Sequence, residues 1–138
     1  MDIDLALLAD AATVDASGKL NILGVFDRLG SDSFPARHPR MALVLRFTAG
    51  LNEAGSHHVD IRLHDPTGEE VVHMDGDMQL GPSASTLTDA IRVPHVLNID
   101  GIVFPKAGRY TFDVEVDGEH QVSVPLTVSG RATQGAQA

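Results

Sequence analysis

Five segments of the chain alternate apolar and polar residues with a period of two. They lie at residues 41–47, 59–63, 72–80, 110–116 and 122–128. Successive side chains of a β-strand point to opposite faces of the sheet, so each run predicts a strand with one buried face. No segment keeps the 3.6-residue period of a helix for long. The chain is therefore predicted to be all-β.

Turn residues separate these runs, at positions 15–18, 65–68 and 117–118. Asp, Pro and Gly at such positions suit tight chain reversals. Short strands between regular turns predict an antiparallel β-sandwich of about eight strands. Tyr110, at the start of an alternating run, is similar to the tyrosine corner of immunoglobulin-like sandwiches, although the cysteine pair and core tryptophan of that fold are missing. The strands are expected near residues 2–14, 19–29, 40–49, 57–65, 69–80, 90–100, 108–117 and 120–129.

The last turn allows two registers. A two-residue turn at 117–118 would place Val114 opposite Gln121, which mixes a buried face with an exposed one. A three-residue loop at 117–119 places Val114 opposite Val122, so the faces agree. We therefore predict the longer loop.

Length and composition limit the class of protein. The 138 residues fit a single domain over residues 1–129, followed by a polar tail, 130–138, that we expect to be disordered. The chain has no cysteine, which excludes disulfides, thiolate metal sites and thiol nucleophiles and fits a reducing compartment. Its start lacks the basic and apolar regions of a signal peptide, and no run approaches the ~20 apolar residues of a membrane helix. A cytoplasmic location without membrane contact is expected.

The charge balance bears on partners. The 19 acidic and 10 basic residues give a net charge of −9. Such a chain is repelled by nucleic acid and by anionic membrane surfaces, so neither is expected as a partner.

The short motifs of common enzyme classes are missing from the sequence. The sequence contains no Gly-x-Ser-x-Gly, no glycine-rich phosphate loop and no His-Glu-x-x-His. The sequence therefore leans against an enzyme and predicts no cofactor.

Histidines and aspartates alternate along the polar face of residues 57–80. The hairpin register can place His58, Asp60 and Arg62 opposite Asp77, Asp75 and His73. Imidazole and carboxylate groups on adjacent strands could bind a metal ion such as zinc. Arg62 argues against this, because its charge competes for the carboxylates; ordinary cross-strand pairs on a solvated face are the other interpretation. The residues of the metal alternative are His58, Asp60, His73 and Asp75.

A second candidate lies in residues 34–40. Two arginines and a histidine in a proline-stiffened loop could hold a carboxylate or phosphate group. The alternative is a rigid connection in which an aromatic side chain plugs the core. The candidate binding residues are Phe34, Arg37, His38 and Arg40.

His95, in step with apolar neighbours, is expected to be a core histidine rather than a catalytic one.

The N-terminal segment is apolar on two faces. Residues 4–12 would suit a helix by propensity, but the spacing of Leu20, Ile22 and Phe26 after the next turn favours a β-hairpin. The opposite face of the second strand carries another apolar set, which one sandwich core cannot bury. Either the 81–90 loop covers this set or a second subunit does, and the loop offers only one sizeable apolar side chain. The predicted interface residues are Leu23, Val25 and Leu29.

Several motifs support a resemblance to a known family. They are L-L-A-D-A-A at 7–12, G-K-L-N-I-L-G-V-F-D at 18–27, F-P-A-R-H-P-R at 34–40, P-K-A-G-R-Y-T-F at 105–112 and V-D-G-E at 116–119. With these motifs the chain resembles a family of small prokaryotic proteins with a domain of unknown function. The resemblance implies an all-β fold and carries over no activity.

The leading functional hypothesis is a non-catalytic binding or assembly module that associates with itself or with an unknown protein partner. One alternative is a metal- or small-ligand-binding, enzyme-like protein that uses the 57–80 face. Another is a structural subunit of a larger particle.

Overall fold

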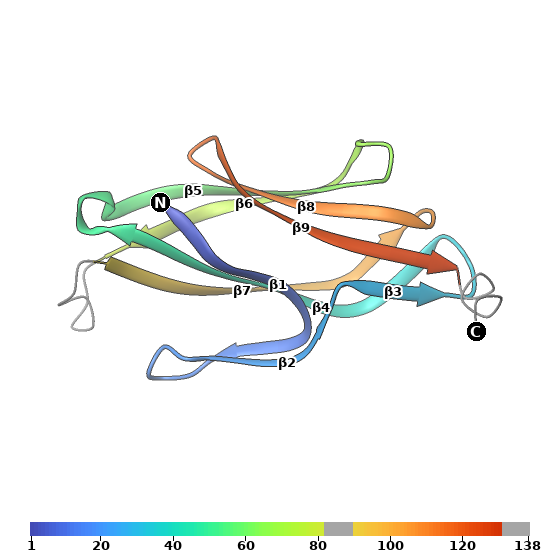
Figure 1. Ribbon diagram of the computed structural model, residues 1–138, viewed down its shortest axis with the longest axis horizontal. Helices are drawn as coiled ribbons and strands as arrows, with labels where there is room; N and C mark the ends of the chain where they lie inside the picture. The colour runs from blue at the N-terminus through green and yellow to red at the C-terminus, as the bar shows by residue number, and fades with distance from the viewer. Residues whose placement is uncertain (82–89, 131–138) are drawn as a thin grey trace.

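The computed structural model describes residues 1–81 and 90–130, and this part of the chain is all-β (Figure 1). It contains nine strands and one short 3₁₀ helix. In chain order these are β1 (Asp2–Val14), β2 (Leu20–Phe26), β3 (Arg28–Ser31), β4 (Ala36–Gly50), η1 (Leu51–Glu53), β5 (Gly55–His64), β6 (Glu70–Leu80), β7 (Ala90–Phe104), β8 (Gly108–Val116) and β9 (Glu119–Gly130). No helix in the described ranges has the length and apolarity needed to cross a membrane.

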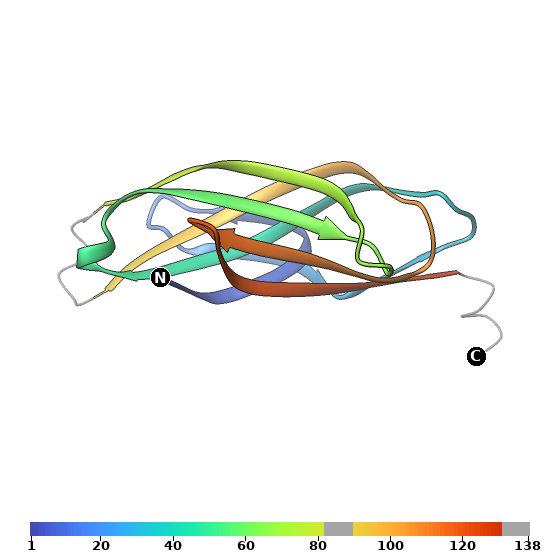
Figure 2. The ribbon, with the colours of Figure 1, turned by 90° about the horizontal axis from the view of Figure 1, so that it is seen from above.

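The strands form two sheets that lie one above the other in Figure 1 and run along the same long axis in Figure 2. One sheet has the order β2-β1-β4-β7, and the other has the order β3-β9-β8-β5-β6. Their inner faces share one hydrophobic core. Its largest fully buried side chains include Phe47, Phe104, Tyr110, Phe112 and Leu126.

Burial in β4 exceeds what alternation predicts. Met41, Leu43 and Leu45 are fully buried, as expected for the inner face. Ala42 and Val44, which alternate with them, are fully buried as well. β4 is a central strand of its sheet, between β1 and β7. In this strand, alternation therefore does not separate a buried face from an exposed one.

The predicted strand at 19–29 is two strands, which is why the total is nine rather than about eight. The chain leaves the first sheet after Phe26 and enters the second as β3. There the Thr127 N–H donates to the Asp27 carbonyl at 2.9 Å, and β3 runs parallel to β9. The prediction of a wholly antiparallel arrangement is therefore wrong at this pair. Alternation marks which residues are strand but not the direction of the partner strand.

The turn between β8 and β9 has the predicted pairing but not the predicted loop. Val114 lies opposite Val122, as expected. The loop, however, has two residues, because Val116 pairs with Glu119. Asp117 and Gly118 have φ values of 51° and 82°, the positive values of a tight hairpin turn. A register shift between Val114 and Glu115 absorbs the extra residue.

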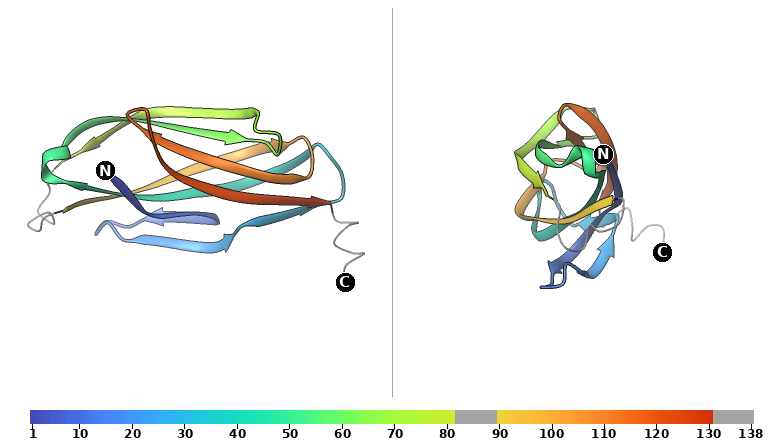
Figure 3. Two further views of the ribbon diagram at one scale, coloured as in Figure 1. Left: turned by 45° about the horizontal axis from the view of Figure 1, so that its top comes forward. Right: turned by 90° about the vertical axis from the view of Figure 1, so that its left-hand side faces the viewer.

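β1 is shared between two partners. Its first part pairs with β4 as far as the register Ala9↔Ala42, and its last part pairs only with β2. The strands around the 15–19 turn therefore form a two-stranded hairpin, residues 10–25, which we term the arm. The arm lies below the two layers in Figure 1 and at the lower edge of the molecule in both views of Figure 3. The hairpin interpretation of residues 4–12 is confirmed.

Two further predictions from the sequence concern Tyr110 and the boundary of the C-terminal tail. The Tyr110 hydroxyl donates to the Lys106 carbonyl at 2.7 Å, so the buried phenol is satisfied by backbone four residues upstream. Gly130, assigned by sequence to the tail, is the last residue of β9. The remaining tail, 131–138, and residues 82–89 of the predicted covering loop lie outside the described residues.

Candidate functional site

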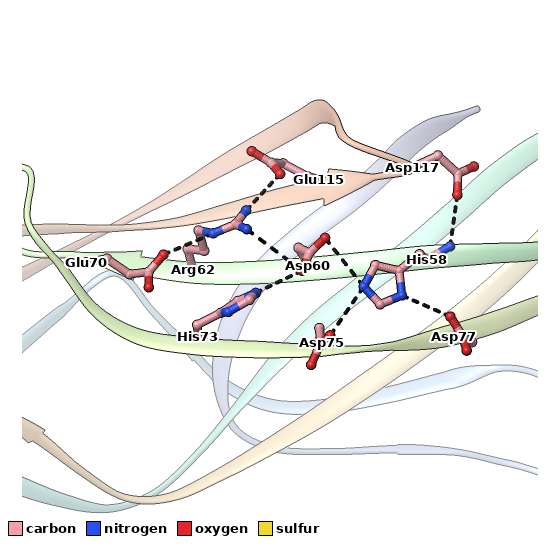
Figure 4. A network of polar contacts seen from close by, with 9 residues as sticks. All are labelled: His58, Asp60, Arg62, Glu70, His73, Asp75, Asp77, Glu115 and Asp117. Atoms are coloured by element: carbon pink, nitrogen blue, oxygen red, sulfur yellow. Dashed lines mark hydrogen bonds and ion pairs between the residues drawn. The ribbon is translucent and has the colours of Figure 1, made fainter.

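The polar face of the β5–β6 hairpin has the predicted register. His58 lies opposite Asp77, Asp60 opposite Asp75, and Arg62 opposite His73. Because strand side chains alternate between faces, these residues project together from the outer surface of the second sheet, as Figure 4 shows.

His58 is surrounded by three carboxylates. Its Nδ1 lies 2.9 Å from Asp77 Oδ1, and its Nε2 lies 3.3 Å from Asp75 Oδ2 and 3.6 Å from Asp60 Oδ2. The hydrogen bond with Asp77, with the nearby carboxylate charges, raises the pKa of the His58 imidazole above its ordinary value. The ring is thus held with one nitrogen on Asp77 and the other facing Asp60 and Asp75.

Asp60 is the shared centre of this cluster. His73 Nε2 lies 2.8 Å from Asp60 Oδ1, and this hydrogen bond is the main reason that the pKa of the Asp60 carboxyl is lowered. The other carboxylate oxygen faces His58. Among the described residues, the one group with metal-ligand spacing is His58, Asp60 and Asp75. His73, part of the sequence-predicted set, bonds to Asp60 from the side.

Arg62 lies opposite His73, as predicted, and contacts three carboxylates. Its guanidinium lies 2.8 Å from Glu115 Oε2 and 3.0 Å from Glu70 Oε1. Its approach to Asp60 Oδ1 is only 3.9 Å. Arg62 thus lies within ion-pair distance of Asp60, as the sequence suggested, but its closer partners are two glutamates on neighbouring strands.

Sequence reasoning missed the residues that other strands contribute to this face. Asp117, in the β8–β9 turn, bonds to His57 Nδ1 at 2.6 Å and accepts the His58 backbone N–H at 2.9 Å. His64 Nδ1 lies 2.6 Å from Asp113 Oδ2. Alternation in β8 places Asp113 on a polar face, but only the pairing of β8 with β5 shows which histidine it meets.

Residues 34–40 are mostly strand rather than loop. β4 begins at Ala36, so Arg37, His38 and Arg40 are extended and pair with β7. Phe34 is partly buried against the core, as the alternative interpretation expected. The His38 ring lies 6.0 Å from that of Phe26, and Arg40 Nε lies 3.7 Å from Asp100 Oδ1. The proline-stiffened loop expected from sequence is therefore wrong.

The arm carries two of the three predicted interface residues. Leu23 and Val25 are 71% and 63% exposed on β2. Leu29 lies on β3 in the other sheet and packs against the main core. Its assignment to the same face is a correction that follows from the crossing after Phe26.

His95 lies at a cavity of about 210 Å³ between β6 and β7. Its ring meets Phe47 edge-on at 6.5 Å, and Met74, Met78 and Leu97 also line the cavity. Burial lowers the pKa of His95. The residue as a whole is nevertheless exposed, so it is not the core histidine that the sequence predicted.

The fold and this face together define a small two-sheet, all-β protein with ionisable side chains gathered on one outer surface. The chain belongs to the family of unknown function DUF6941, which matches residues 4–129. The family resemblance inferred from the motifs is thus confirmed. A comparison with curated proteins gives no significant match.

Proposed function

We propose that the protein is a non-catalytic assembly module that associates with a second copy of itself through the arm. The observation that carries this proposal is the concentration of exposed apolar side chains. Among the described residues, five large apolar side chains are exposed, and three of them belong to the arm. They are Val14, Leu23 and Val25.

The edge of β2 supports the same proposal. β2 is the last strand of its sheet and pairs only with β1, so its other edge leaves backbone donors and acceptors open. Residues 20–26 contain no charged side chain, in a chain with a net charge of −9. Two highly acidic copies repel each other, and an uncharged edge is a place where they can approach closely.

A symmetric pair of β2 strands is the arrangement that we favour. A strand placed antiparallel to its own copy pairs the same residues in both copies, which is the geometry of a closed two-fold dimer. Each Leu or Val side chain that becomes fully buried there contributes roughly 1.5–3 kcal/mol relative to full exposure.

Light scattering after size-exclusion chromatography tests the proposal. The wild type is expected to be dimeric at micromolar concentration, while Val25→Asp and Leu23→Asp are expected to be monomeric with an unchanged β spectrum. Leu51→Asp is the matched control: Leu51 is 51% exposed but lies on η1, away from the arm, so this variant should remain dimeric.

The outcomes separate the alternatives. A monomeric wild type would contradict self-association and leave the predicted covering loop or another protein as the cover. A species larger than a dimer, also lost in Val25→Asp, would favour a subunit of a larger particle.

Two finer assignments belong to this proposal. An immunoglobulin-like sandwich is supported by the Tyr110–Lys106 hydrogen bond, which has the form of a tyrosine corner. A cytoplasmic setting is supported by the cysteine-free composition, which needs no oxidising compartment.

A further inference from the structure

Three side chains of the β5–β6 hairpin direct ligand atoms toward one point, away from the arm. The nitrogen and oxygen atoms of His58, Asp60 and Asp75 lie within 4.8 Å of one another. His58 Nε2 is 3.3 Å from Asp75 Oδ2 and 3.6 Å from Asp60 Oδ2. Tetrahedral zinc with bonds of about 2.0–2.2 Å separates its ligand atoms by about 3.3–3.6 Å. Two of the three separations between ligand atoms therefore match a zinc-sized ion, and the third, between the Asp60 and Asp75 oxygens, is at most 4.8 Å.

The neighbouring residues orient these ligands. Asp77 bonds to His58 Nδ1, which leaves Nε2 as the nitrogen that faces the point. His73 bonds to Asp60 Oδ1, which leaves Oδ2 facing His58. Metal-binding histidines commonly hold their second ring nitrogen on a carboxylate in this way, and such contacts fix both tautomer and ring orientation.

The backbone register adds an argument from charge. Asp60 and Asp75 are directly opposite each other on paired strands, and like charges at opposed positions are destabilising. Asp77 brings a third carboxylate to the same histidine. Arg62 offsets this charge only in part: its guanidinium lies 3.9 Å from the Asp60 oxygen that His73 contacts and is closer to Glu115 and Glu70. A dication at the point would offset much of the negative charge that these carboxylates place there.

We propose that His58, Asp60 and Asp75 bind one divalent transition-metal ion, with Zn²⁺ as the expected occupant. One imidazole and two carboxylates favour zinc over magnesium or calcium, which prefer all-oxygen sites. Three protein ligands leave a fourth position for water or for a ligand from a partner. The site is on the second sheet and does not depend on self-association through the arm.

The experiment uses the untagged full chain after chelator treatment and dialysis, titrated with Zn²⁺ by calorimetry, with metal content measured by mass spectrometry. One ion per chain is expected. Asp75→Asn, which keeps the side-chain shape, and His58→Ala should each weaken binding by at least roughly a hundredfold. Asp77→Asn should weaken it by roughly 10–100-fold, because it removes only the group that orients His58.

His64→Ala is the matched control. His64 pairs with Asp113 at 2.6 Å on the same face of the same sheet but lies outside the ligand group, so its loss should leave zinc binding unchanged. Circular dichroism checks the fold of each variant, and Asp75→Asn keeps the test valid if His58→Ala does not fold. Absence of stoichiometric binding, wild-type affinity in Asp75→Asn, or equal loss in His64→Ala would overturn the proposal. Val25→Asp should bind zinc as the wild type does, so this test and the dimer test can fail separately.

Discussion

At the scale of single residues, two aspartates show how a side chain dictates a turn. Asp65 Oδ1 accepts the Thr67 hydroxyl at 2.6 Å, the Thr67 N–H at 2.9 Å and the Glu69 N–H at 3.0 Å. Asp15 makes the same three contacts with Ser17 and Lys19, at 2.6, 2.8 and 3.0 Å. One local sequence, Asp-x-Ser/Thr-Gly-x, therefore folds into one turn at two places.

The Asp65 carboxylate predicts a pH dependence of stability. The Thr67 hydroxyl, with the backbone donors, lowers the pKa of Asp65 below the ordinary value of 3.8. A lowered folded-state pKa stabilises the protein fully above the unfolded value and loses that contribution as the pH falls through the folded value. In urea unfolding at pH 6, the wild type should therefore have a larger free energy of unfolding than Asp65→Asn. The two free energies should converge as the pH drops below about 4.

Asp27→Asn serves as the control. That carboxylate is 79% exposed, and its ion pair with the exposed Arg28 is long, at 3.6 Å, so its charge should contribute little to stability. A difference between wild type and Asp65→Asn that stays constant down to strongly acidic pH would show that shape, rather than charge, accounts for the role of Asp65.

At the scale of elements, the turn before β8 packs against the turn between β5 and β6. Gly108 has a φ of 141°, and a Cβ there would lie 2.4 Å from Pro66 Cγ. Gly118, in the β8–β9 turn, also has a positive φ, 82°, but a Cβ there would meet nothing within 4 Å. Both glycines therefore have a positive φ, but only at Gly108 would an added Cβ also clash with a neighbouring residue.

Gly108→Ala is therefore expected to destabilise the protein more than Gly118→Ala. The second variant should cost about 1 kcal/mol from the unfavourable φ alone, and the first roughly 2–4 kcal/mol, because the clash with Pro66 adds to it. Chemical denaturation measures both values. Equal losses would mean that the Pro66 turn moves aside at little cost.

At the scale of the whole molecule, the protein divides into a two-sheet body with one core and an arm outside that core. An isolated two-stranded hairpin is only marginally stable in water, so the arm needs either a cover or tolerance of frequent opening. Covering the arm by a second copy would therefore also raise the local stability of its two strands.

Hydrogen exchange should show this coupling. In monomeric Val25→Asp, backbone amides of residues 20–26 should exchange much faster than those at the centres of β4 and β8, whose side chains are buried. In the wild type, protection of 20–26 should rise with protein concentration. Slow exchange of 20–26 in the monomeric variant would instead mean that the arm is stable without a partner.

The sequence by itself determined that the chain is all-β, where most of its strands lie, and the pairing of the β5–β6 hairpin. These are local properties: alternation assigns faces, and a tight turn fixes the register of the two strands beside it. The opposition of His58 to Asp77 and of Asp60 to Asp75 followed from that rule and was correct.

Only the tertiary structure decided which distant strands pair and which partners the long side chains reach. Because the chain crosses to the second sheet after Phe26, Leu29 packs against the core and is not part of the arm. The sheet to which a strand belongs depends on long-range pairing rather than on alternation. The pairing of β8 with β5 placed Glu115 within 2.8 Å of Arg62, a partner that alternation alone does not reveal. Arginine has a long, flexible side chain, so its partner depends on which carboxylates the assembled sheet places within its reach.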